Sequence, residues 1–222
     1  MPNTIRGLPD FVQARAYALG RLERELPSTL YYHSIWHTRD EVVTRADWLA
    51  RQEDLNAEAR LLVKTGAYYH DIGFVEGRQN HEVRSASIAG SVLPQFGYAV
   101  PQVRMIQGMI LATRIPQLPH THLEEIVADA DLDVLGRDDF LARSRALRAE
   151  LAAAGEYIDH KTWYTRQARF LRQHRYFTPS ARRDRCSAKD ENLLALYELI
   201  AGCGLSPDVP PLTPMAPTFA LT

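Results

Sequence analysis

The feature that most constrains this chain is an apolar helical pattern that runs directly into an adjacent His70–Asp71 pair and stops at Gly73. Residues three or four apart share one face of an α-helix. Counting back from His70 in such steps gives the stripe Gly66, Leu62, Ala59 and Leu55. The pattern predicts a helix over about 56–70, capped by Asp54, with the His70 imidazole pointing into the core. A hydrogen-bonded core histidine and a metal ligand both fit that position.

Length and composition suit one domain with a complete core. The chain has 222 residues, of which 45% are hydrophobic, so it needs no disulfide or metal to supplement the core. Its charges nearly cancel, with 26 Lys and Arg against 27 Asp and Glu, so nothing indicates a surface for duplex nucleic acid or an anionic membrane. A small molecule is the expected partner.

The two cysteines, Cys186 and Cys203, lack a CxxC spacing, which argues against a disulfide framework or a structural zinc site. We interpret both as structural. The N-terminus has no basic segment followed by an apolar run, and no apolar run is long enough to span a bilayer. We therefore predict a reduced, cytoplasmic protein without a membrane segment. The sequence does not fix the oligomeric state, and a homodimer is compatible with it.

Helical periodicity recurs along the chain without an internal repeat or strand-like alternation, and it predicts an all-α fold. Proline and glycine mark the breaks between helices. The expected helices cover about 8–26, 38–51, 56–70, 83–93, 101–114, a segment from 123 past 131, 138–154, 162–174 and 189–201. Arginines such as Arg143 and Arg148 are interpreted as solvated faces of the later helices. The stretch 206–222 holds five prolines and is expected to be an extended tail.

One later stripe contains an aspartate where an apolar residue is expected. The stripe is Leu123, Val127, Asp131 and Val134. A buried ionised carboxylate is costly unless it is paired or binds a metal, so Asp131 needs a partner. An arginine-paired core aspartate is the alternative to a metal ligand. Asp129 and Asp133 lie about 200° away on the helical wheel, and we expect them nearer solvent or next to the ligands.

His33 and His37 are four residues apart, which puts them on one face if the helix has already begun there. Periodicity does not decide their role, because His37 falls off the stripe formed by Val42, Ala46 and Leu49. A pair of polar residues at a helix entry is the alternative to a functional pair.

The order His37, His70–Asp71, Asp131 resembles the H…HD…D signature of the HD superfamily of metal-dependent phosphohydrolases. Four blocks carry the likeness to one bacterial HD subfamily: YHSIWHT at 32–38, HDIGF at 70–74, HEVRSA at 81–86 and DADLDVLG at 129–136. The likeness spans about 30–178 and ends in FLRQHRYFT at 170–178. It implies a single-domain helical bundle of the HD type. We divide the chain into an N-terminal helix packing on the core (1–30), the metal-binding domain (31–178), a C-terminal helix of the same domain (179–204) and a Pro-rich tail (205–222).

The resemblance implies that His37, His70, Asp71 and Asp131 converge on one divalent cation. Such N and O ligands suit Mn, Fe, Co, Ni or Mg better than a sulfur-preferring ion. Water activated by the cation would attack phosphorus, and Asp71 is a candidate for moving protons as well as for ligation. The implied activity is that of a phosphomonoesterase or phosphodiesterase acting on a small phosphate ester, such as a nucleotide.

Further residues are expected around this cation. Dinuclear HD proteins carry extra histidines, one of them where this chain has Ala112, so we predict one ion. His81 resembles the other extra position, and we expect His81 and Glu82 to orient water or substrate. A surface-loop histidine and a helix N-terminal glutamate favoured by the dipole are the alternatives. His33 is expected to donate to a phosphate or to cap the helix.

Arg78 and Arg114 flank the expected site in sequence, and their paired N–H donors suit a phosphate. Ordinary surface positions are the alternative for both. His120 and His122 follow a Pro-rich turn and are weaker ligand candidates. Two other functions stay open: a di-iron oxygenase of the HD type, which Ala112 disfavours, and a non-catalytic protein that senses a nucleotide.

Overall fold

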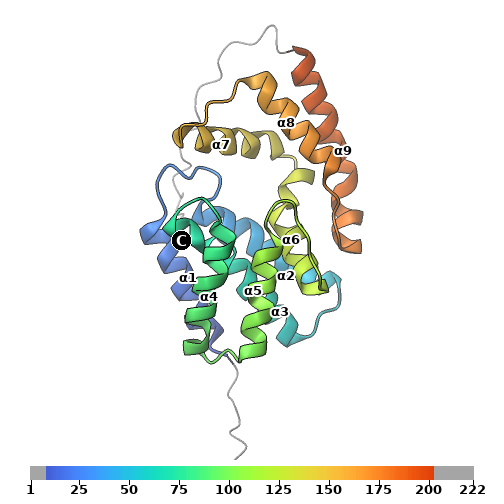
Figure 1. Cartoon of the computed structure of the whole chain (residues 1–222). Coiled ribbons are helices and arrows are strands. Elements are labelled where there is room, and N and C mark those ends of the chain that lie inside the picture. Colours follow the sequence, from blue (N-terminus) through green and yellow to red (C-terminus); the bar gives the residue numbers. More distant parts are fainter. Residues whose placement is uncertain (1–8, 203–222) are drawn as a thin grey trace, which may run out of the picture.

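The computed structural model describes residues 9–202, and every regular element in that range is helical. In Figure 1, α1 to α6 form a bundle, and α7, α8 and α9 lie across its upper end. The elements are α1 (Phe11–Glu25), the π-helical η1 (His37–Val42), α2 (Val43–Gln52), α3 (Ala57–Tyr69), the 3₁₀ turn η2 (Ile72–Glu76), α4 (His81–Val92), η3 (Leu93–Phe96), α5 (Val100–Ala112), α6 (His122–Asp131), η4 (Asp133–Gly136), α7 (Phe140–Ala153), α8 (His160–Gln173) and α9 (Pro179–Gly202). One hydrophobic core joins both layers. The predicted all-α, single-domain bundle is therefore confirmed.

The core is built around α3, which contacts α1, α2, α5 and α6. Leu62 and Val63 of α3 are buried, as are Ile106 and Ile110 of α5. Burial of each large aliphatic side chain stabilises the fold by about 1.5–3 kcal/mol. Because α3 runs through this core, His70, the residue that caps its C-terminus, is also fully buried.

The first turn of α3 is capped by Asn56. Its side-chain oxygen accepts a hydrogen bond from the Ala59 N–H at 2.9 Å, which satisfies a donor that the first turn leaves free. Asp54 instead lies in the preceding turn, in a left-handed conformation with φ of 54°. The predicted Asp54 cap is therefore wrong, because the chain is still turning at that residue.

After α3 the chain forms the 3₁₀ turn η2, which packs against the start of α4. A Cβ atom on Gly73 would collide with the backbone of His81 and Ser85, so this close approach requires glycine. The Gly73 N–H also donates to the Ser85 hydroxyl at 2.8 Å. The break at Gly73 thus places the first residue of α4, His81, beside Asp71.

Asp129 of α6 forms hydrogen bonds with the segment that leads into α9. It is fully buried, and its carboxylate accepts from the N–H groups of Phe177 and Thr178 at 2.9 and 2.8 Å. The Thr178 hydroxyl donates to the same carboxylate at 2.7 Å. Three donors therefore compensate for the burial of one carboxylate.

Asp133 is also buried, and it pairs with Arg45 at 2.6 Å and with Arg185 at 2.7 Å. Asp129 and Asp133 were expected nearer solvent or next to the ligands; the first expectation is wrong because both are buried, and the contacts described above are with residues other than the ligands. Their side of α6 and η4 is covered by residues from the C-terminal part of the chain, which a helical wheel for one segment does not include.

The last helix, α9, begins at Pro179, ten residues before the predicted start at 189. Proline suits the first turn of a helix, and the Thr178 hydroxyl accepts from the Ala181 N–H at 3.2 Å. The arginine-rich start lacks an apolar stripe, so periodicity missed it. The predicted tail and Cys203 lie outside the described residues, whereas Cys186 is half-buried. Within residues 9–202, no helix combines the length and apolar character needed to cross a membrane.

We expect Asp129→Ala to lower the free energy of unfolding by about 2–4 kcal/mol, because it leaves buried N–H donors without an acceptor. Urea unfolding followed by circular dichroism measures this change. The matched control is Asp40→Ala, which removes an exposed carboxylate paired with its neighbour Arg39 and should change stability by less than about 0.5 kcal/mol. Equal effects of the two substitutions would contradict the role given to Asp129.

Candidate metal centre

Three side chains from separate parts of the chain meet at one point. His37 begins η1, His70 caps the C-terminus of α3, and Asp131 is the last residue of α6. One ligand atom from each lies within 4.8 Å of the other two. The Nε2 atoms of His37 and His70 lie 3.3 and 3.4 Å from the same oxygen, Asp131 Oδ1. Asp131 therefore faces two imidazoles, and the alternative of an arginine-paired core aspartate is not what the structure shows.

Asp71 adds a second carboxylate to this group. Its Oδ2 lies 3.2 Å from His70 Nε2 and 3.9 Å from His37 Nε2. Ligand atoms bound about 2.1 Å from one ion are about 3.0–3.4 Å apart in octahedral or tetrahedral geometry. The two separations from Asp131 Oδ1 are of that size, so His37, His70 and Asp131 have the spacing of a shared ion site, and Asp71 lies beside them.

The hydrogen bonds of the two histidines decide which nitrogen faces the carboxylates. His70 Nδ1 donates to the Ala67 carbonyl at 2.8 Å, and His37 Nδ1 donates to Glu41 at 2.9 Å. With the proton on Nδ1, each Nε2 directs a lone pair at carboxylate oxygens. Such an arrangement is repulsive unless a proton or a metal ion lies between the atoms. Within residues 9–202, His70 Nε2 and Asp71 Oδ2 are buried without a hydrogen-bond partner, whereas His37 Nε2 is within hydrogen-bond distance of Asp131 Oδ1, at 3.3 Å.

When no cation is bound, protons lie between the imidazole nitrogens and the carboxylate oxygens. Burial lowers the pKa of His70, but the Asp71 and Asp131 carboxylates outweigh burial and raise it well above its usual value. Burial raises the pKa of Asp71, yet His70 and His81 bring it well below the ordinary range, and the two imidazoles similarly lower the pKa of Asp131 to about 2. A divalent ion must displace these protons, so its binding weakens as the pH falls.

Glu41 orients His37 and was not identified from the sequence. Its carboxylate is buried and also contacts Arg143 at 2.8 Å and Arg137 at 2.7 Å. Burial raises the pKa of Glu41, but His37 and the two arginines more than compensate and lower it. Arg143 is thus part of the site's support, and its interpretation as a solvated surface residue is wrong. The spacing of four between His37 and Glu41 was the available signal.

Glu150 of α7 holds His33 in the same way. The Glu150 carboxylate is buried, accepts from the backbone N–H groups of Tyr32 and His33, and lies 2.6 Å from His33 Nδ1. His33 precedes the helix, so it does not share a helical face with His37. Its ring stacks on Phe74, with a centroid distance of 4.4 Å. Nothing in the sequence pointed to Glu150, which is more than a hundred residues away.

His81 lies at the edge of the metal-ligand group. Its Nε2 is 3.4 Å from Asp71 Oδ1, and its Nδ1 lies 3.3 Å from the Arg78 carbonyl and 3.6 Å from Glu82. His81 and Glu82 are therefore beside the group, and Arg78 contacts it through its backbone.

Other candidates are not brought to the cluster. Arg114 is exposed after α5, and its side chain makes no hydrogen bond to the cluster within residues 9–202. His120 is exposed, and His122 pairs with Glu125 at 3.0 Å.

Comparison with known proteins gives a likeness of fold. No family model matches the chain, and no curated protein matches it either. A solved structure from an uncultured Thermotogales bacterium, described as a predicted HD superfamily hydrolase, is 17% identical with a TM-score of 0.57, and the match covers 90% of this chain and 96% of that one.

Two structures of Bacillus subtilis YpgQ are also similar. The one in complex with ADP is 19% identical, with a TM-score of 0.61 over 88% of this chain and 95% of that chain. The other is 20% identical, with a TM-score of 0.58 over 87% and 93%. These matches confirm the resemblance to the HD superfamily at the level of the fold.

We expect Glu41→Gln to weaken binding of Mn²⁺ by about 10–100-fold, because it removes the anionic acceptor that fixes the His37 tautomer. Isothermal titration calorimetry at constant pH measures the affinity. Asp40→Asn, one residue away and exposed, is the matched control and should leave the affinity unchanged. A normal affinity in Glu41→Gln would show that His37 is not held as a ligand by this contact.

Proposed function

We propose that this protein is a divalent-metal-dependent phosphohydrolase acting on a small phosphate ester, with nucleotides as the preferred class. The observation that carries the proposal is the convergence of two buried imidazoles on the Asp131 carboxylate, with each Nδ1 held by its own acceptor and each Nε2 facing the carboxylate. The HD-type fold supports hydrolase chemistry, since one similar structure is described as a predicted HD superfamily hydrolase. Another is a complex with ADP, which supports a nucleotide as the substrate class.

In this proposal His37, His70, Asp71 and Asp131 hold one ion. When bound, a divalent cation lowers the pKa of coordinated water and neutralises charge on phosphoryl oxygens. Two imidazoles and two carboxylates leave room for water and substrate around an ion that accepts six ligands. A single ion is proposed because Ala112, which is buried, offers no ligand where dinuclear proteins have a histidine.

The surrounding residues are proposed to handle protons and phosphate. Asp71 has one oxygen toward the ligand group and the other toward His81, so the pair is placed to pass a proton between Asp71 Oδ1 and His81 Nε2. The Arg78 carbonyl orients His81 through Nδ1, and Glu82 lies 3.6 Å from the same nitrogen. His33 is held by Glu150 through Nδ1, and its contact with a phosphate stays a prediction. Phosphate binding by Arg78 and Arg114 stays a prediction.

Metal-loaded protein should hydrolyse at least one nucleotide in a screen of nucleoside mono-, di- and triphosphates and cyclic nucleotides, with release of phosphate or pyrophosphate as the readout. Asp131→Ala should lose bound metal and at least about 100-fold of kcat/KM together, because one anionic ligand is removed. Metal content by elemental analysis and turnover are measured on the same samples.

Asp138→Ala is the matched control, since Asp138 is exposed and only seven residues further along the chain. It should keep both metal and turnover. Thermal stabilisation by nucleotides without any turnover would replace the proposal with a sensing role. Two bridged irons in the purified protein would instead indicate an oxygenase.

A further inference from the structure

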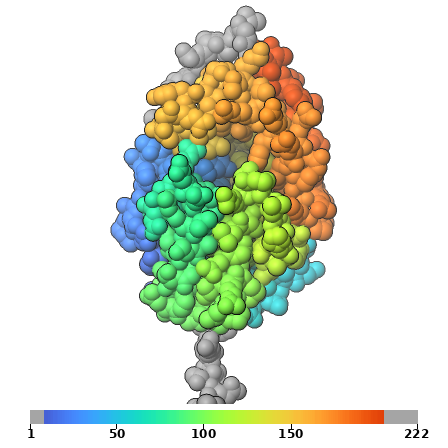
Figure 2. All heavy atoms as spheres, viewed as in Figure 1, coloured from blue at the N-terminus to red at the C-terminus, as the bar shows by residue number. Residues whose placement is uncertain are grey.

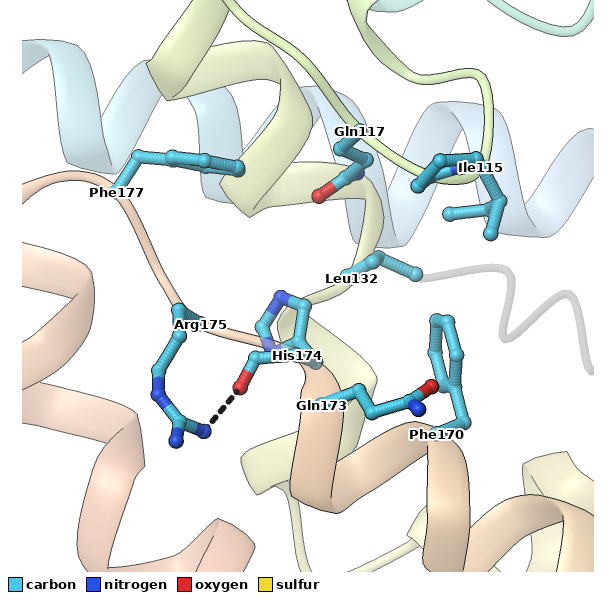
Figure 3. A pocket seen from close by; sticks show the side chains of 9 residues that line it. Ile115, Gln117, Leu132, Phe170, Gln173, His174, Arg175 and Phe177 are labelled. Atoms are coloured by element: carbon cyan, nitrogen blue, oxygen red, sulfur yellow. Dashed lines mark hydrogen bonds between the residues drawn. The ribbon is translucent and has the colours of Figure 1, made fainter.

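A second site lies beside the helix that carries Asp131. It is a cavity of about 270 Å³ between the turn after α5 and the end of α8 (Figure 3). The volume far exceeds the roughly 10–15 Å³ that one water needs. In Figure 2 the surface is hollowed between the lower bundle and the upper layer, near the meeting of the lime and orange segments. One lining residue, Leu132, directly follows the candidate metal ligand Asp131 in the sequence.

Two side chains in this cavity have buried polar atoms without partners among residues 9–202. His174 is only 9% exposed, and neither of its ring nitrogens has a hydrogen-bond partner in that range. The side-chain oxygen of Gln117 is likewise buried and unpartnered, although its Nε2 donates to the Ala128 carbonyl of α6 at 2.9 Å. Figure 3 shows the Gln117 oxygen and the His174 ring directed toward the same space. Buried polar groups normally have partners, so this pair needs an explanation.

The chemistry of the pair restricts what can bind. Burial, with help from Lys189 and Arg175, lowers the pKa of His174 to about 3, so its ring is neutral and offers one donor and one acceptor. The Gln117 oxygen is only an acceptor. A ligand that pairs with both side chains therefore needs an N–H donor for the Gln117 oxygen and, close to it, a second polar ring atom for the His174 ring.

The walls of the cavity are apolar and partly aromatic. They include Phe170, Phe177, Leu132 and Ile115. A ligand that suits such walls has a flat apolar face and carries its hydrogen-bonding groups only at the edge. A nucleobase has both this face and the required edge.

We infer that this cavity binds the base of the nucleotide, with Gln117 and His174 recognising its hydrogen-bonding edge while the phosphates extend toward the metal centre. The inference rests on the proposed function for the identity of the substrate. It also gives a role to the block 170–178, which the resemblance singled out and the metal chemistry leaves unused.

A purely structural role for His174 predicts different behaviour. The ring packs against Tyr176 with a centroid distance of 4.6 Å, and the backbone carbonyl of His174, not the ring, accepts from Lys189. Packing alone would be preserved by phenylalanine, whereas recognition of a base needs the ring nitrogens. His174→Phe therefore separates the two roles.

The test measures binding of adenosine, which has a base but no phosphate, by ligand-observed NMR. His174→Phe and, as a second variant, Gln117→Leu should each weaken adenosine binding by about tenfold or more. His174→Gln, which keeps a donor and an acceptor, should recover part of the loss. His160→Phe, at the exposed opposite end of α8, is the matched control and should bind normally. The Tm of His174→Phe should be unchanged or higher by about 2–4 °C, since unpartnered nitrogens are removed.

Kinetics give an independent readout. For ADP or the preferred nucleotide, His174→Phe and Gln117→Leu should raise KM with little change in kcat, and ribose 5-phosphate, which has no base, should be turned over at the wild-type rate. The wild-type protein could hydrolyse no nucleotide while the variants still lose adenosine binding. That result would support the base pocket and reject the proposed hydrolase.

Normal nucleotide KM and normal adenosine binding in both variants would overturn the pocket and leave the hydrolase intact. The absence of adenosine binding to the wild-type protein, or an equal loss of turnover with ribose 5-phosphate, would also overturn it.

Discussion

The whole site depends on two buried imidazoles that donate Nδ1–H hydrogen bonds to oxygen atoms and turn Nε2 toward the same carboxylate. His70 donates to the carbonyl of Ala67, so the end of α3 itself fixes the orientation of the ring. His37 donates to a glutamate. Burial lowers the pKa of both imidazoles, but the nearby carboxylates outweigh burial and raise it, so a proton on Nε2 supplies the positive charge between these atoms when no metal is bound. A divalent ion therefore competes with protons for a position that the fold has already prepared.

The upper layer of helices is part of this arrangement. Arg143 and Glu150 both lie on α7, and they hold Glu41 and His33 respectively. The two contacts hold two points of the segment 33–41, which leads into η1. A bundle of α1 to α6 alone would contain the ligand atoms and Glu41 but would lack Glu150, which holds His33, and Arg143, which holds Glu41.

Much of this could be predicted from the chain, and the misses have physical causes. The stripes of α3 and α6 placed His70 and Asp131 toward the interior, since the periodicity of a regular helix reports its buried face. His37 was assigned only by resemblance, because a π-helical segment holds an extra residue per turn. At about 100° per residue, His37 would lie about 140° from Val42, and one extra residue reduces this to about 40°. The partners Glu150 and Asp129 depend on contacts between distant segments, which no local pattern encodes.

The π-helical turn at His37 also bears on how tolerant the protein is to change. A π-helical turn holds one residue more than a regular α-helical turn, so removing one residue from it would return the segment to α-helical geometry. That deletion would rotate the His37 imidazole away from His70 and Asp131 by roughly one residue's angle, about 100°. The convergence of the three side chains thus depends on the extra residue in this one turn.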